Sequence, residues 1–181
     1  MSEKQRDWRK YENYTRQILN DDRVQKYLQE YFNLHNLKIK PKERFTGKKT
    51  ETKWEVDAYG YDIDNQLILI ECKHSEKKCV VQNVIAAFAY IIQDVEAQSG
   101  IVVTTRGLQS GAIKVAKTEN IGLIKVEYNS TDKNFFVRFS SNETKPSQAI
   151  AAFTDQLSGF SGMDGEMVVT QYSLDDAQKR F

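Results

Sequence analysis

The chain has 181 residues, with 26 lysines and arginines against 25 aspartates and glutamates, and a formal net charge of +1. This length predicts a single domain with a short tail, and its two cysteines and two histidines exclude a disulfide framework and zinc fingers of the paired-Cys, paired-His kind. No stretch approaches the roughly 20 apolar residues that span a bilayer, and residues 1–10 lack the apolar core of a signal peptide, so we expect a cytoplasmic protein without a membrane partner.

The nearly neutral total conceals charged blocks. Residues 1–53 carry 14 basic and 8 acidic side chains, a net charge of +6, whereas residues 54–99 carry 3 and 8, a net charge of −5. Residues 100–145 carry 7 and 4, and residues 146–181 carry 2 and 5. An acidic middle between basic segments fits a metal site beside phosphate-binding surfaces, although ordinary solvated surface has the same pattern.

The first half of the chain predicts two helices and three strands. Apolar residues at helical spacing predict a helix over 7–19 and a second helix, capped by Asp21 and Asp22, that ends near Phe32. Alternation predicts a strand over 37–45, where Pro41 favours an edge position, followed by a lysine-containing turn at 46–53. Strands over 54–61 and 67–73 then form a hairpin around a turn at 62–66.

The second half predicts helices over 80–97 and 108–119, separated by a β-branched strand over 101–105 that is typical of the centre of a sheet. The first of these helices is apolar on two sides, which suggests burial on both. Strands over 122–128 and 135–139 follow. The order ααβββαβαββ predicts an α/β fold: a central mixed β-sheet with helices on both faces.

We expect residues 1–139 to form this domain and residues 140–181 to form a C-terminal extension. The extension is predicted to contain a linker at 140–146, a short helix at 147–157 and a glycine-containing loop at 159–165. A strand over 167–172 is expected to follow.

The hairpin carries the residues that suggest chemistry. Strand alternation places Glu71 and Lys73 on one side and Cys72 on the other, with Asp57 of the preceding strand within cross-strand reach of Glu71. Two carboxylates suit Mg²⁺, and a neighbouring lysine can orient a water or stabilise charge on a phosphate, as phosphodiester hydrolysis requires. A surface ion-pair ladder is the alternative, but residues 67–70 are apolar, and charges leaving a buried strand are costly unless they are paired or bind metal.

This arrangement resembles the PD-(D/E)xK nuclease core, and more specifically the Mrr-like restriction endonucleases. Members of that branch have an apolar strand ending in Glu-Cys-Lys, here Glu71 to Lys73, and then a helix. A segment like Gly100 to Gly107 follows, then a helix with alanines, here Ala112 and Ala116, and then a strand like residues 121–124. The blocks appear in the family's order over roughly residues 7–128, and the resemblance implies a restriction-endonuclease-like core.

The resemblance also implies roles for single residues. Asp57, Glu71 and the backbone carbonyl of Cys72 would ligate Mg²⁺, for which Mn²⁺ would substitute, and Lys73 would position the attacking water. Family members often have a glutamate on the first helix near the metals, which Glu12 matches, so Glu12 would be a further catalytic residue and metal ligand. Some have a polar site residue at the start of the helix after the motif, where this chain has Gln82; a solvated helix start is the alternative for it.

The chain departs from the family's pattern at two positions. Glu55 stands where members commonly have a glycine, and Val56 stands where many have a proline. Because Glu55 and Asp57 lie two residues apart in a strand, their side chains point to the same face, so Glu55 is either an extra ligand or a perturbation of the site.

Basic residues are candidates for contacts with the DNA backbone, although a lysine-rich edge strand that resists aggregation would look the same. The candidates are Lys38, Lys40, Lys42, Arg44, Lys48, Lys49, Lys53 and Arg106. A nucleophilic pair of His74 and Cys79 lacks a third group to orient it and is disfavoured.

The predicted function is a Mg²⁺-dependent DNA endonuclease of the restriction or antiviral-defence type. One alternative is a structure-selective nuclease that resembles Holliday-junction resolvases. The other is a catalytically silent module that binds DNA or partner subunits of a defence system. We expect a homodimer, with the helix over 80–97 and the tail as candidate interface.

Overall fold

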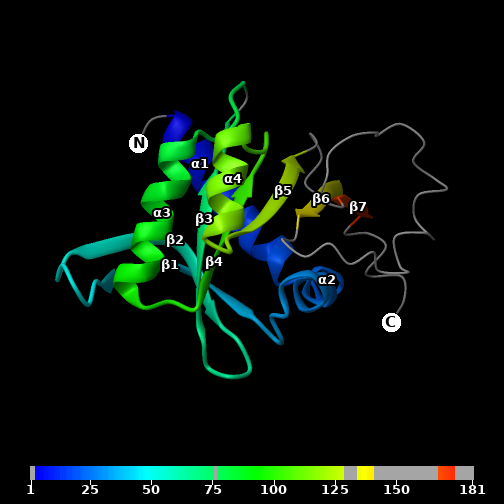
Figure 1. The fold of residues 1–181 in the computed structure, drawn as a ribbon. Coiled ribbons are helices and arrows are strands. Elements are labelled where there is room, and N and C mark those ends of the chain that lie inside the picture. Colours follow the sequence, from blue (N-terminus) through cyan, green and yellow to red (C-terminus); the bar gives the residue numbers. More distant parts are fainter. Residues whose placement is uncertain (1–2, 76, 129–133, 141–166, 174–181) are drawn as a thin grey trace.

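The structure is a computed structural model that describes residues 3–75, 77–128, 134–140 and 167–173. In this part of the chain, four helices flank a seven-stranded sheet whose strands lie in chain order from β1 to β7 (Figure 1). The elements are α1 (Glu3–Leu19), α2 (Asp22–Phe32), β1 (Lys38–Thr46), β2 (Lys53–Tyr61), β3 (Leu67–Lys73), α3 (Gln82–Val95), β4 (Ser99–Thr104), α4 (Ser110–Thr118), β5 (Gly122–Tyr128), β6 (Asn134–Ser140) and β7 (Met167–Ser173). None of the helices described is long and apolar enough to cross a membrane.

The sheet is mixed, as predicted. Strands β1, β2 and β3 pair antiparallel, β3, β4 and β5 pair parallel, and β5, β6 and β7 pair antiparallel. The edge position predicted for the strand with Pro41 is confirmed, because β1 ends the sheet. The central strand β4 is buried from Gly100 to Thr104, as its β-branched sequence indicates.

Of the predicted C-terminal extension, the structure describes Ser140, at the end of β6, and one strand. The strand expected over 167–172 is present as β7, and it continues the sheet beside β6. The helix predicted over 147–157 and the loop predicted over 159–165 lie outside the described residues, as does nearly all of the linker. The division into a domain and an extension stays a prediction.

Two hydrophobic clusters form, one containing side chains of α1 and α2 and the other containing side chains of α3 and α4. Strand β3 contributes to both, since Ile70 and Cys72 belong to the first cluster and Leu69 belongs to the second. Burial of each such aliphatic side chain contributes about 1.5–3 kcal/mol. The residues of β2 on either side of Asp57 pack into different clusters: Val56 into the second and Ala58 into the first.

Three helices begin at other residues than the sequence pattern predicts. Helix α4 starts at Ser110 rather than Leu108, because Leu108 forms a β-bridge with Val80. Helix α1 starts at Glu3 rather than Asp7, because its first turn consists of polar helix-formers that give no apolar signal. Helix α3 starts at Gln82 rather than Val80, because Val81 is extended and Val80 forms a β-bridge with Leu108. The helix stops at Val95, and Glu96 adopts a left-handed conformation with φ of 58°.

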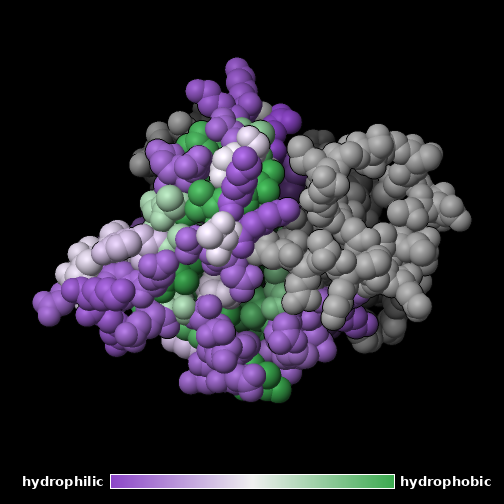
Figure 2. Space-filling model, in the orientation of Figure 1, coloured by the Kyte–Doolittle hydropathy of each residue, from purple (hydrophilic) through white to green (hydrophobic). Residues whose placement is uncertain are grey.

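Helix α3 is buried on one side, so the prediction of burial on both sides is wrong for the described chain. Ile85 and Phe88 lie in the core, whereas Ala86, Ala87 and Tyr90 are exposed. The outer face carries small and aromatic residues, which make it apolar in the sequence pattern. Hydropathy does not specify whether a second layer covers a helix, so the pattern could not distinguish this exposed face from a buried one. The hairpin of β1 and β2 projects from the body, and Figure 2 shows it largely covered by hydrophilic residues.

Candidate active site

The site forms where β2 and β3 separate. Their ladder runs from the pair Tyr61↔Leu67 to the pair Ala58↔Ile70 and is not continued beyond it. Past this point the backbone N–H of Cys72 donates a hydrogen bond to Oδ2 of Asp57, with a donor–acceptor distance of 2.9 Å. The Asp57 carboxylate therefore replaces a backbone acceptor of β2, and it lies beside the end of β3 as the hairpin pattern predicts.

Glu71 and Lys73 form an ion pair at the end of β3, and both side chains are mostly buried. Lys73 Nζ also lies 5.7 Å from the ring centroid of Trp8 on α1, a cation–π contact that restrains the ammonium. The sequence pattern gave Trp8 no role at the site. Its spacing of four residues from Glu12 places both side chains on one face of α1, which is the signal that connects them.

A second group of charges lies on the other side of Asp57. Lys42 Nζ is 3.5 Å from Oε1 of Glu12, 3.3 Å from Oε1 of Glu55 and 3.7 Å from Oδ1 of Asp57. Arg44 also pairs with Glu55, through Nη2 at 3.0 Å and Nε at 3.1 Å from Oε2. Helix α1 and strands β1 and β2 thus bring together Glu12, Glu55 and Asp57 around one lysine.

Burial disfavours the charged form of two of these carboxylates. Burial, and then the charge of Asp57, raise the pKa of Glu71, while Lys73 opposes the shift. The same two causes raise the pKa of Glu12, opposed by Lys42. For exposed Glu55 the pKa is lowered, because Arg44 and then Lys42 donate hydrogen bonds to it. The site is therefore electronegative and favours an additional cation.

A divalent metal ion fits this site by its chemistry. The donors are hard carboxylate oxygens, which Mg²⁺ prefers, and it is usually held by one or two carboxylates plus waters and phosphates. Oε1 of Glu12 is a buried oxygen without a hydrogen-bond partner. Among the described residues, no three His, Cys, Asp or Glu side chains are already arranged to hold an ion. The protein therefore offers the pair Asp57 and Glu71, and backbone, water or phosphate oxygens would complete the coordination. Glu12 pairs with Lys42 here, and its role as a metal ligand stays a prediction.

The remaining sequence candidates lie in several places. Gln82 is exposed in the first turn of α3 and lies close to Gly111 of α4, where an added Cβ would be 2.6 Å from its Oε1. In the part of the chain that the structure describes, it forms no hydrogen bond with Asp57 or Glu71. The His74 ring packs at a tilt against Tyr11 with ring centroids 5.0 Å apart, whereas the Cys79 thiol contacts the carbonyl of Arg106. These different contacts leave His74 and Cys79 without the geometry of a nucleophilic pair.

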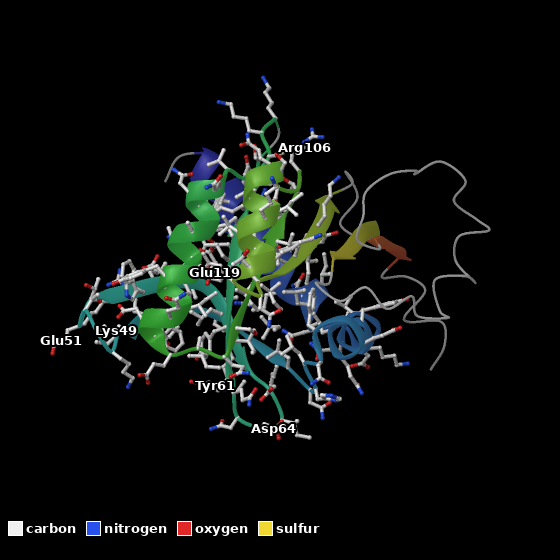
Figure 3. All side chains as sticks on the ribbon, viewed as in Figure 1. Lys49, Glu51, Tyr61, Asp64, Arg106 and Glu119 are labelled. Atoms are coloured by element: carbon white, nitrogen blue, oxygen red, sulfur yellow. The ribbon has the colours of Figure 1, made fainter. Side chains whose placement is uncertain are left out.

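The candidate DNA contacts fall into three groups. Lys38, Lys40, Lys42 and Arg44 are exposed on the edge strand β1, with Lys40 Nζ 5.7 and 5.5 Å from the ring centroids of Tyr59 and Tyr61. Lys48, Lys49 and Lys53 are exposed at or beside the tip of the β1–β2 hairpin. Arg106 follows β4 and lies apart from that tip, where Lys49 and Glu51 project (Figure 3).

The tip of the hairpin is fixed to α3 by Asp94, a carboxylate that sequence reasoning missed. Asp94 is 1% exposed, and its Oδ1 accepts hydrogen bonds from the backbone N–H groups of Lys49 at 3.0 Å and Thr50 at 3.1 Å. Its Oδ2 accepts from Trp54 Nε1 at 2.6 Å. Thr50 Oγ1 also donates to it. These bonds hold the lysine-bearing turn in one position relative to the body.

Comparison with known protein families gives a match. A family model for the Mrr catalytic domain, described as "Restriction endonuclease", matches residues 16–128. The chain belongs to this family. The match includes Asp57, Glu71 and Lys73, and it begins after Trp8 and Glu12. The domain is thus a restriction-endonuclease-like nuclease domain of the PD-(D/E)xK family, and the fold predicted from the sequence is confirmed.

Several solved structures are similar to this chain at low sequence identity. A protein of unknown function, AF1548, is 19% identical with a TM-score of 0.47, over 62% of this chain and 56% of that one. A repair endonuclease from Pyrococcus abyssi is 18% identical with a TM-score of 0.36, over 49% and 39%. EndoMS in its apo form is 18% identical with a TM-score of 0.36, over 58% and 45%. This chain thus spans between 39% and 56% of their length. No curated protein matches it.

Proposed function

We propose that the chain is a Mg²⁺-dependent endonuclease that hydrolyses DNA phosphodiester bonds, of the restriction or antiviral-defence type. The observation that carries the proposal is the 2.9 Å hydrogen bond from the Cys72 N–H to Asp57 Oδ2. It holds the Asp57 carboxylate at the end of β3, beside the ion pair of Glu71 and Lys73. Two carboxylates and an ammonium at one strand end are the groups needed for metal-assisted hydrolysis.

Asp57 and Glu71 would hold the Mg²⁺, with the Cys72 carbonyl as a further oxygen ligand. The bound ion supplies Lewis acidity, which eases deprotonation of a water and stabilises negative charge on the phosphate. Lys73, restrained by Glu71 and Trp8, orients the attacking water and donates to the phosphate oxygens. In the reaction the water oxygen bonds to phosphorus, the bond to one ester oxygen breaks, and that oxygen takes a proton.

DNA would contact the basic residues of the edge strand and hairpin. Strand β1 runs from Lys42, which lies beside the carboxylates of the site, to the hairpin tip that carries Lys48 and Lys49. A duplex lying along this ribbon would meet lysines on its phosphates while one phosphodiester reached Asp57. Backbone contacts of this kind position the duplex without reading its sequence.

Plasmid cleavage in Mg²⁺ or Mn²⁺ tests the proposal. Asp57→Asn and Lys73→Met, which keep side-chain size, are expected to lower the rate by at least about 100-fold, as expected when a charged group at the reacting centre is lost. Asp64→Asn and Lys114→Met make the same chemical changes at exposed positions, in the turn after β2 and on α4. Equal rates for the wild type and all four variants would show that the activity does not come from this site.

The choice of DNA substrate separates the proposal from its alternatives. Linear, supercoiled, methylated, single-stranded and four-way-junction DNA are assayed in parallel. Faster cleavage of the junction would favour the resolvase-like function, and no cleavage of any substrate would favour the silent module. The homodimer stays a prediction, for which light scattering on the purified chain is the test. Cytoplasmic location, defence partners and the role of Gln82 also stay predictions.

A further inference from the structure

Lys42 differs from the other basic residues of β1 because it faces three carboxylates. The pairs Pro41↔Ala58 and Glu43↔Val56 bracket it, so it lies opposite Asp57 in the register of β1 and β2. Lys40, two residues earlier, lies over aromatic rings instead. A lysine at this position is therefore directed into the site rather than along the edge of the sheet.

The carboxylates around Lys42 need a compensating cation. The side chains of Glu12 and Asp57 are 12% and 13% exposed, and charges with so little water contact are costly unless paired. Oε1 of Glu12 has no hydrogen-bond partner, so the Lys42 ammonium at 3.5 Å supplies its compensation. The contacts of Lys42, between 3.3 and 3.7 Å, are longer than the 2.7–3.2 Å of ordinary N–H···O bonds. The ammonium is thus shared among the three groups.

We propose that the Lys42 ammonium is the resident cation of the three carboxylates Glu12, Glu55 and Asp57. It takes the place that a second divalent ion would otherwise hold. The enzyme then binds one divalent ion, through Asp57 and Glu71, although Glu12 and Glu55 bring two further carboxylates to Lys42. In two-metal sites the ions lie about 3.5–4 Å apart, and an ammonium within that distance of Asp57 repels a second ion. This inference rests on the proposed metal site and adds the number of ions to it.

Calorimetric titration with Mn²⁺ in the absence of DNA tests the inference, because it counts ions without measuring activity. The wild type is expected to bind one Mn²⁺ per chain and Lys42→Met two, since methionine keeps the stem and removes the charge. Lys42→Arg retains the charge and is expected to bind one. Lys40→Met, on the same strand and face, is the matched control and is also expected to bind one.

The outcomes separate the two proposals. Two ions in the wild type, or one ion in Lys42→Met at unchanged affinity, overturn the role of Lys42 and leave the nuclease proposal intact. No ion in the wild type, or unchanged binding in Asp57→Asn, contradicts the proposed metal site itself. If Lys42→Met is unfolded alone, Mn²⁺ is expected to restore its melting transition, and failure of Mn²⁺ to restore it overturns the inference as well.

Discussion

Replacing Lys48 and Lys49 by glutamine should weaken DNA binding and flatten its salt dependence. Both lysines lie in the turn that Asp94 holds, through backbone groups that glutamine retains. Both side chains are exposed, and among the described residues neither ammonium is in an ion pair. The substitutions therefore remove two positive charges from the hairpin tip and leave the fold unchanged.

The size of the effect follows from counterion release. Each phosphate contact adds about 0.9 to the slope of log K against log salt, so two contacts contribute about 1.8. Between 50 and 200 mM salt, a fourfold change, the wild type should lose about 12-fold more affinity than the variant. Fluorescence anisotropy of a labelled duplex in EDTA, at four salt concentrations, measures both slopes without cleavage.

A control with the same charge change separates the hairpin from a general effect of net charge. Lys26→Gln combined with Lys114→Gln removes two exposed lysines, from α2 and α4. Its slope should match that of the wild type. A slope in the hairpin variant equal to that of the wild type, or an equal fall in the control, would refute the contact between the hairpin and DNA.

Two further predictions concern stability. The hydrogen bond from Thr50, against the opposing effect of burial, lowers the pKa of Asp94 below its ordinary value of 3.8. The Asp94 carboxylate therefore stabilises the fold fully above pH 3.8, and this stabilisation is lost as the pH falls through the lowered pKa. Asp94→Asn should therefore reduce Tm at pH 7 and flatten the loss of Tm below about pH 4 in melts followed by circular dichroism; curves parallel to the wild type would contradict this. Gly100→Ala places a Cβ 2.4 Å from Ile92 Cδ1, which should cost about 1–3 kcal/mol in urea unfolding. Gly111→Ala meets a flexible side-chain end instead and should cost nothing, so equal losses would argue against the packing explanation.

Much of the site could be predicted because its central residues are local in sequence. Asp57 and Glu71 belong to adjacent strands of one hairpin, and the two-residue period of a strand assigns Cys72 to the core and its neighbours to the site. The element order was also readable, since buried parallel strands are apolar throughout and the helices have one apolar face. The exposure of the outer face of α3 could not be predicted, because it depends on whether another layer covers the helix.

The sequence by itself therefore determined the fold class and the hairpin pair of carboxylates with their lysine, because strand period and turn length are properties of short segments. The tertiary structure decided how distant groups meet them. Trp8, and the Glu12 that the family resemblance placed near the metals, reach the site because α1 packs against the sheet. The register of β1 and β2 directs Lys42 toward carboxylates, where its sequence suggested DNA contact alone. Asp94 became an anchor because its partners lie 40 to 45 positions earlier in the chain, and no local pattern specifies such a pairing.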